Sequence, residues 1–177
     1  MKKKIIIIII VVALAGFGLY FTARNKTTLQ AQANVGNGVG EIAPAFSYTT
    51  LDGTKVKSTS LRNKVIVITS AAAWCPTCIM EAQQFSPVYQ KYKSDAVVFI
   101  TVDIDPRDNK EFIEKFKQSN NTPWDYANAQ GSTDISQKLG LDRFEITYII
   151  DKNGMIRFKD SSITSSDKLD TEIQKIL

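Results

Sequence analysis

The stretch KVIVITSAAAWCPTC, residues 64–78, constrains the fold more than any other part of the 177-residue chain. It opens with a compact β-branched run, which is typical of a central strand buried on both faces of a sheet. A helix is predicted from Pro76 to Lys93, because proline suits a first helical turn and apolar residues then recur at helical spacing. Cys75 and Cys78, the only cysteines in the chain, are therefore expected where a strand passes into a helix.

Strand and helix patterns alternate through the rest of the chain, and Pro87 predicts a kink within the first helix. Further strands are predicted at 96–105 and 124–127, further helices at 109–119, 134–139 and 165–177, and hairpins at 48–56 and 145–159. Phe112, Ile113 and Phe116 are expected on the apolar face of the helix at 109–119. Alternating strands and helices that finish in a hairpin imply an α/β sandwich with a mixed sheet.

Residues 1–23 have the pattern of a membrane segment. Three lysines precede an uncharged run of 19 residues from Ile5 to Ala23, which as a helix would span about 28 Å, close to the hydrocarbon thickness of a bilayer. The lysines favour an inside N-terminus, with the rest of a single-pass chain on the extracytoplasmic side of the cell membrane. The alternative is a cleaved signal peptide, because AQA at 31–33 has the form of a cleavage site. Residues 24–40 are expected to form a flexible tether and residues 41–177 the folded domain.

The net charge of +4 does not indicate nucleic-acid binding. Five basic residues fall within the first 26 positions, which hold no acidic residue, so the remainder carries 17 basic and 18 acidic residues. A nearly neutral domain with interspersed charges lacks the basic surface that a nucleic-acid partner requires. Nucleic acid is therefore excluded as a partner.

The absence of histidine removes most metal chemistry for the cysteine pair. A zinc site needs about four Cys, His or carboxylate ligands, commonly including two such pairs, and one copy of this chain cannot build the common versions. Attachment of c-type haem needs a histidine directly after the second cysteine, and copper sites of the cysteine-plus-histidine type are also lost. No metal and no cofactor beyond a Cys75–Cys78 disulfide are predicted.

Two interpretations of the cysteines remain. They could be inert core thiols or a passive disulfide in a non-catalytic, membrane-tethered interaction module, although so short a loop would constrain the unfolded chain very little. Alternatively, a helix N-terminus at Cys75 favours the thiolate, which is the attacking species, and Cys78 lies one turn on, where it can resolve a mixed disulfide. Pro76 and Thr77 would then tune the redox potential. Trp74 would cover one side of the site, or simply pack at the edge of the core.

The sequence also resembles a known family. WCPTC after a VIVIT strand, preceded by APAFSYTTLDGTKVKSTSLRNK and followed by TYIIDKNGMIRF, is similar to the TlpA/ResA group of thioredoxin-like proteins over about residues 41–177. The resemblance implies a thioredoxin-like three-layer sandwich with a central mixed sheet. It also implies an exported, often membrane-anchored thiol–disulfide oxidoreductase that acts on protein thiols and disulfides, in some cases the haem-binding cysteines of apocytochrome c. Reduction is the favoured direction, which would require a membrane electron donor.

Three positions carry further implications of this resemblance. Glu81 matches an acidic residue that recurs in the group and influences cysteine reactivity, although a solvated helix carboxylate is an equal alternative. Thr69 stands where thioredoxins proper keep a buried aspartate. The superfamily's cis-proline, which offers backbone groups to the substrate, is replaced by Glu145, or by Ile146 if the register shifts by one. A cis bond before a non-proline residue costs about 2.5 to 4 kcal/mol, so a trans bond is predicted here.

A thiol peroxidase of the peroxiredoxin type is the rival enzyme. Peroxiredoxins share the APxF and DG opening, but they usually carry Thr or Ser three residues before the peroxidatic cysteine, and this position is Ala72.

Overall fold

The computed structural model describes residues 34–93 and 96–177. Over these two ranges, no helix combines the length and apolar character needed to cross a bilayer. The predicted membrane segment at 1–23, the start of the predicted tether and the AQA sequence lie outside the described residues.

A five-stranded mixed sheet forms the centre of the domain, with strand order β5-β4-β3-β6-β7. The strands are β3 (Val65–Ala71), β4 (Val97–Asp103), β5 (Asp125–Ala127), β6 (Thr147–Ile150) and β7 (Ile156–Asp160). The first three run parallel, whereas β6 pairs antiparallel with both β3 and β7. Every residue of β3 is buried, as expected for a strand covered on both faces. The predicted α/β sandwich with a mixed sheet is confirmed.

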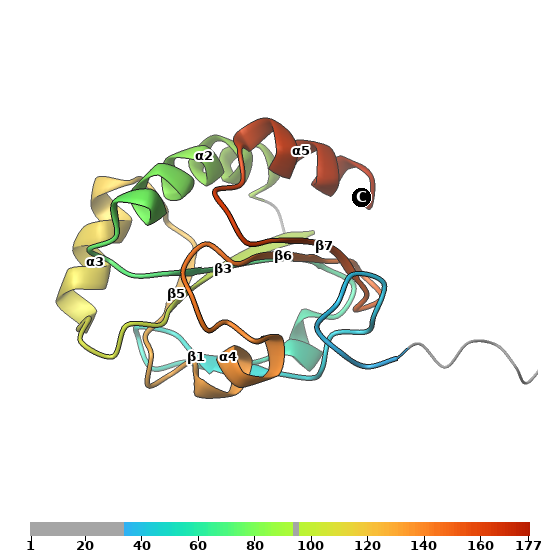
Figure 1. The fold of residues 1–177 in the computed structure, drawn as a ribbon, viewed down its shortest axis with the longest axis horizontal. Coiled ribbons are helices and arrows are strands. Elements are labelled where there is room, and N and C mark those ends of the chain that lie inside the picture. Colours follow the sequence, from blue (N-terminus) through green and yellow to red (C-terminus); the bar gives the residue numbers. More distant parts are fainter. Residues whose placement is uncertain (1–33, 94–95) are drawn as a thin grey trace, which may run out of the picture. The chain divides into compact units, whose positions relative to one another are not determined.

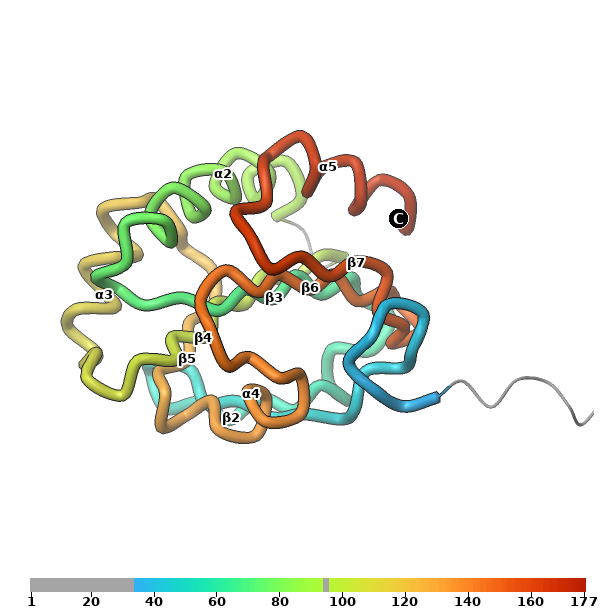
Figure 2. Tube along the Cα trace, in the orientation of Figure 1, coloured from blue at the N-terminus to red at the C-terminus, as the bar shows by residue number. Residues whose placement is uncertain are grey.

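Three layers are visible in Figure 1. One face of the sheet is covered by α2 (Pro76–Tyr92), α3 (Lys110–Ser119) and α5 (Ser166–Gln174). The other face is covered by the hairpin of β1 (Ser47–Thr49) and β2 (Lys55–Lys57), by the 3-10 helix η1 (Ser58–Leu61) and by α4 (Thr133–Leu139). A hydrophobic core lies on each face of the sheet, and the strands contribute to both because alternate side chains point to opposite faces. Val65 and Val67 lie in the core beneath α2, α3 and α5, and Ile66 and Ile68 in the core on the other face. Figure 2 shows α2 and α5 side by side above the sheet.

Strand register brings the functional segments to one edge of the sheet. Ala71 pairs with Asp103, so the carboxyl ends of β3 and β4 coincide. Thr69 pairs with Thr147 across the antiparallel β3–β6 ladder, which places the residues just before β6 at the same edge. The backbone N–H of Ser70 donates to the Ile146 carbonyl at 3.1 Å and extends this contact. The cysteine segment after β3 therefore meets the segment around residue 145.

Three details of the helices add to what the sequence predicts. The helix α2 continues through Pro87 to Tyr92 as one element. Of the three residues expected on the apolar face of α3, Ile113 and Phe116 are buried in the core, whereas Phe112 is 54% exposed. Ser165 is the N-cap of α5, where its hydroxyl accepts from the Lys168 N–H at 3.3 Å.

Part of the predicted tether is packed against the domain. The Ile42 N–H donates to the Asn34 carbonyl at 2.9 Å, and the Gly40 N–H donates to the Ile156 carbonyl at 2.8 Å. The Tyr148 hydroxyl reaches the Asn37 carbonyl at 3.2 Å. Residues 34–40 thus make hydrogen bonds to residues of the predicted domain.

Candidate active site

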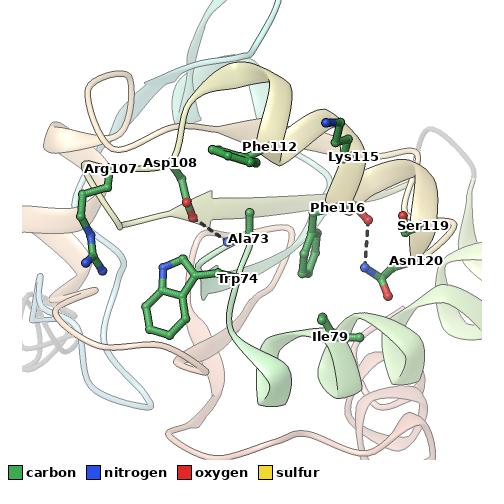
Figure 3. Close-up of a pocket in the computed structure, with 10 residues that line it drawn as sticks. All are labelled: Ala73, Trp74, Ile79, Arg107, Asp108, Phe112, Lys115, Phe116, Ser119 and Asn120. Carbon is green, nitrogen blue, oxygen red and sulfur yellow. Dashed lines mark hydrogen bonds between the residues drawn. The ribbon is translucent and has the colours of Figure 1, made fainter.

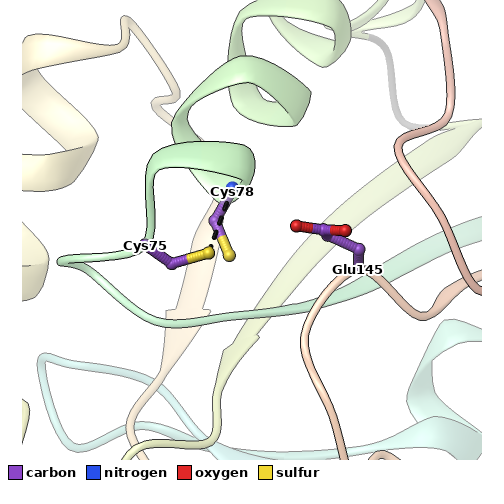
Figure 4. A group of neighbouring side chains, drawn as sticks. All are labelled: Cys75, Cys78 and Glu145. Carbon is purple, nitrogen blue, oxygen red and sulfur yellow. Dashed lines mark hydrogen bonds between the residues drawn. The ribbon is translucent and has the colours of Figure 1, made fainter.

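The two cysteines occupy the start of α2, as the sequence predicts. Cys75 is the N-cap residue with extended backbone angles, and Pro76 occupies the first helical position. The Cys75 sulfur accepts a hydrogen bond from the Cys78 N–H at 3.3 Å and lies 3.2 Å from the Thr77 hydroxyl (Figure 4). A sulfur in this position takes the place of the capping oxygen at a helix N-terminus, where the helix dipole stabilises negative charge.

Both thiols are free and differ in their surroundings. Cys75 is 4% exposed and Cys78 2% exposed, while Pro76 and Thr77 are exposed. Burial raises the pKa of the Cys78 thiol, and the hydrogen bond with Cys75 and the charge of Glu145 raise it further. Cys78 is thus held as a thiol, and it needs a proton acceptor before it can attack a disulfide.

Glu81 is buried, so the alternative of a solvated helix carboxylate is wrong. The side chain is 2% exposed and accepts three hydrogen bonds. These come from the Thr69 hydroxyl at 2.8 Å, the Thr147 hydroxyl at 3.2 Å and the Thr164 N–H at 3.1 Å. Burial raises the pKa of Glu81 to about 7, although the hydrogen bonds oppose this shift. The carboxyl can therefore take up or release a proton near neutral pH.

A small cavity connects Glu81 with Cys78. Both residues line a space of about 10 Å³, together with Thr69 and Thr101 among the polar groups. That volume is about the minimum that a single water molecule occupies, and the threonine hydroxyls supply polar partners for one. Thr69, which replaces the aspartate of thioredoxins proper, therefore lies beside a carboxylate supplied by the helix instead of by the strand.

Glu145 stands opposite the cysteines in an unusual backbone conformation. Its φ is +63°, in the left-handed region that favours glycine, and no peptide bond among the described residues is cis, which agrees with the predicted trans bond. The Glu145 N–H donates to the Ser70 carbonyl at 2.8 Å. The N–H of Ile146, whose side chain is buried, donates to the Ser70 hydroxyl at 3.0 Å. These two hydrogen bonds hold the backbone at residues 145–146 against Ser70. Figure 4 shows the Glu145 carboxylate directed toward the two sulfurs.

Trp74 is 55% exposed, so it does not pack in the core. Its indole N–H donates to Asp105 at 2.7 Å, the Arg107 guanidinium lies 5.7 Å from the ring, and Phe144 meets the ring edge-on at 5.6 Å. The ring is therefore held at the surface next to Cys75, where an incoming partner can contact it.

Three buried aspartates support the cysteine segment, and sequence reasoning missed them. The Ala73 N–H donates to Asp103 at 3.1 Å and to Asp108 at 2.7 Å, while Asp105 holds Trp74. Burial and the neighbouring Asp108 carboxylate raise the pKa of Asp103 to about 8. The signal was present in the acidic sequence DIDPRD at 103–108, which follows directly after a buried strand.

A pocket of about 630 Å³ lies beside Trp74, between the start of α2 and α3 (Figure 3). Ile79, Phe112 and Phe116 supply much of its apolar lining, and Arg107 and Lys115 supply positive charge. The exposed ring of Phe112 thus lines a surface pocket close to the cysteines.

These features define a thiol-redox protein. Its dithiol is buried where a strand of the five-stranded mixed sheet passes into a helix, and it lies near the carboxyl of Glu81, whose pKa is about 7. Residues 38–173 match the Redoxin family, and the chain belongs to that family.

One of the two relatives compared below matches nearly the whole chain. The thiol–disulfide oxidoreductase ResA of Bacillus anthracis is 26% identical over 175 residues, which cover 98% of this chain and 94% of the relative. Chloroplastic peroxiredoxin Q of Gentiana triflora is 30% identical over 128 residues, covering 67% of this chain and 56% of the relative.

A solved structure shows the same fold. The thioredoxin domain of a thiol–disulfide oxidoreductase from Bacteroides vulgatus superimposes with a TM-score of 0.66 at 21% identity, covering 78% of this chain and 96% of that domain. The predicted thioredoxin-like fold is thus confirmed.

Proposed function

We propose that the chain is a thiol–disulfide oxidoreductase in which Cys75 attacks and Cys78 resolves. The observation that carries the proposal is the position of the Cys75 sulfur at the N-cap of α2, where it accepts the Cys78 N–H at 3.3 Å. Negative charge on this sulfur is stabilised by the helix terminus, so the reactive thiolate needs no histidine.

The reaction runs in two exchanges. The Cys75 thiolate attacks one sulfur of a substrate disulfide, which forms a mixed disulfide and releases the other substrate sulfur as a thiolate. Cys78 then loses its proton and attacks the Cys75 sulfur. The Cys75–Cys78 disulfide forms, the second substrate thiolate leaves, and two electrons have passed from the dithiol to the substrate.

Glu81 is the proposed proton acceptor for Cys78. It lines the same cavity as Cys78, and its pKa of about 7 matches a group that accepts a proton at neutral pH. A water molecule in the cavity could carry the proton between the two side chains. The resemblance to the TlpA/ResA group supports this role, because an acidic residue recurs there at the matching position.

The substrate class is proposed to be protein disulfides, with the chain acting as a reductase outside the cytoplasm. The relative named ResA, the exposed Trp74 and the pocket beside it support a protein substrate. The basic and apolar N-terminal sequence supports export and membrane attachment, with an electron donor in the membrane to regenerate the dithiol. Haem-binding cysteines of apocytochrome c are one substrate that the resemblance implies. Pro76 and Thr77 are proposed to tune the redox potential of the dithiol. Glu145 and Ile146 are proposed to form part of the surface that binds the substrate.

Trapping tests this proposal. A Cys78→Ser variant of the full chain should accumulate mixed disulfides on Cys75 in cells, and a reducing agent should cleave them. The matched Cys75→Ser variant should trap none. If Cys78→Ser captures no protein, or if the Cys75–Cys78 disulfide has so low a reduction potential that thiol donors cannot reduce it, the disulfide is structural and the proposal fails.

Thiol peroxidase activity is the second candidate, favoured by the likeness to peroxiredoxin Q. Against it, the residue three positions before Cys75 is Ala72, which is fully buried and carries no hydroxyl for the peroxide. Repeated turnover of hydrogen peroxide by the purified chain, faster than its exchange with protein disulfides, would favour the peroxidase.

A further inference from the structure

Three atoms that can bind a metal ion converge at the site. The sulfurs of Cys75 and Cys78 and a carboxylate oxygen of Glu145 all lie within 4.8 Å of one another (Figure 4). The carboxylate comes from the segment before β6, so only the folded chain brings it to the cysteines. Within the described residues, the Glu145 carboxylate makes no hydrogen bond and no ion pair.

We propose that the reduced chain binds one Zn²⁺ ion through Cys75, Cys78 and Glu145, with water in the fourth position. Zinc sites with three protein ligands and one open position are a common arrangement. The sequence-based exclusion of zinc addressed the common versions, which contain two cysteine or histidine pairs. The fold adds a third ligand that spacing along the chain does not reveal.

The distances are suitable for this ion. Zinc lies about 2.3 Å from sulfur and about 2.0 to 2.2 Å from oxygen, so tetrahedral ligands stand about 3.5 to 3.8 Å apart. The three atoms, within 4.8 Å of one another, need to close by at most about 1.3 Å. The half-buried side chain of Glu145 has rotatable bonds for this closure, while its backbone stays anchored to Ser70.

The charges also favour a cation. Without one, the Glu145 carboxylate repels negative charge on the two sulfurs, and no cationic partner among the described residues neutralises it. A divalent ion converts this repulsion into attraction. The N-terminus of α2 stabilises the remaining negative charge, and the Cys78 N–H and Thr77 hydroxyl already lie against the Cys75 sulfur as outer-shell partners.

Metal binding and thiol exchange would use the same sulfurs in exclusive states. Zn²⁺ requires both thiolates, whereas the oxidised site holds them in a disulfide. Oxidation of the zinc-bound dithiol by diamide would take two electrons from the two thiolates and form the Cys75–Cys78 disulfide. Diamide, with two protons from the solvent, would be reduced to the hydrazine, and Zn²⁺ would be released. The inference goes beyond the proposed oxidoreductase function, because bound zinc would protect the dithiol and block exchange.

The test is a metal titration of the full chain in detergent, reduced and free of thiol reagents. Co²⁺ serves as the spectroscopic probe and Zn²⁺ as its competitor. We expect one Co²⁺ per chain, with sulfur-to-cobalt charge-transfer absorption, displacement by Zn²⁺ and no binding after oxidation with diamide. Glu145→Gln should weaken Zn²⁺ binding about 10-fold or more, since loss of even an outer-shell partner costs that much. Glu145→Asp keeps the carboxylate and should retain most of the affinity.

The matched control is Glu114→Gln, which removes a half-buried carboxylate of α3 that pairs with Lys110 and should leave binding unchanged. Equal Zn²⁺ affinity in wild type and in a Glu145→Gln variant with native circular dichroism would overturn the proposal. One metal per two chains would also overturn it, because two copies would then supply four thiolates. Since the titration requires no turnover, a failed metal site leaves the exchange activity standing, and failure of the trapping experiment leaves this result intact.

Discussion

Replacement of Glu81 by Gln tests the central step of the proposed mechanism. Glutamine has the same shape, and its amide oxygen can keep the bonds from the Thr147 hydroxyl and the Thr164 N–H, at 3.2 and 3.1 Å. The amide nitrogen would face the Thr69 hydroxyl, which can rotate from donor to acceptor. The variant therefore keeps the hydrogen bonds of the carboxyl but cannot accept a proton.

The rate of resolution should fall strongly in this variant. A positioned general base contributes about 10²- to 10⁴-fold, so we expect attack by Cys78 to slow at least 100-fold at pH 7. In the wild type this rate should rise as pH increases through about 7, because the Glu81 carboxylate becomes the predominant form there. The Glu81→Gln variant should lack this inflection.

The pH dependence of the free energy of unfolding provides an independent test of the raised pKa of Glu81. The folded chain holds a proton at Glu81 that the unfolded chain has lost, because the pKa is 4.5 in the unfolded reference and about 7 in the fold. At about 1.4 kcal/mol per pKa unit, Glu81 should lower the free energy of unfolding of the wild type by about 3 kcal/mol as pH rises from about 4.5 to above 7. Glutamine removes this contribution, so the variant should match the wild type at low pH and exceed its stability at high pH.

The assay is a single-turnover reaction of the reduced chain with a disulfide peptide, quenched in acid and analysed by mass spectrometry. Accumulation of the Cys75 mixed disulfide measures attack, and its decay measures resolution. Urea unfolding across the same pH range gives the stability difference. An unchanged pH inflection in the decay of Glu81→Gln would refute Glu81 as the proton acceptor, even if the overall rate were lower.

Three further predictions concern the residues around the cysteines. Glu145→Gly should raise the free energy of unfolding by up to about 1 kcal/mol in urea, because glycine tolerates the positive φ; a decrease would show that the backbone is not strained there. Asp103→Asn should flatten the loss of stability that occurs as pH rises from about 3.8 to about 8, since the folded chain keeps a proton on Asp103 that the unfolded chain loses; an unchanged slope would contradict the raised pKa. Phe116→Ala should cost about 3 to 5 kcal/mol and Phe112→Ala less than about 1 kcal/mol, because only Phe116 is buried; equal losses would contradict this difference in burial.

The sequence alone determined the fold class and the dithiol. Periodicity is a local property, so a fully β-branched run predicted the buried strand β3, and apolar spacing after Pro76 predicted α2. The order of elements then restricted the architecture to an α/β sandwich. The pattern did not show that Phe112 would be exposed. The part of an apolar helix face that meets the sheet depends on how the helix packs against it.

Tertiary structure alone decided the environment of the dithiol. Whether Glu81 is solvated or buried depends on three threonines from the β3–β6 ladder and from the segment before α5, which are far apart in sequence. The convergence of Glu145 on the cysteines depends on antiparallel pairing of β6 with β3. The support of Trp74 by Asp105 depends on parallel pairing of β4 with β3. Charge, burial and pKa arise from atoms brought together across the sheet, so they follow from strand register and not from spacing along the chain.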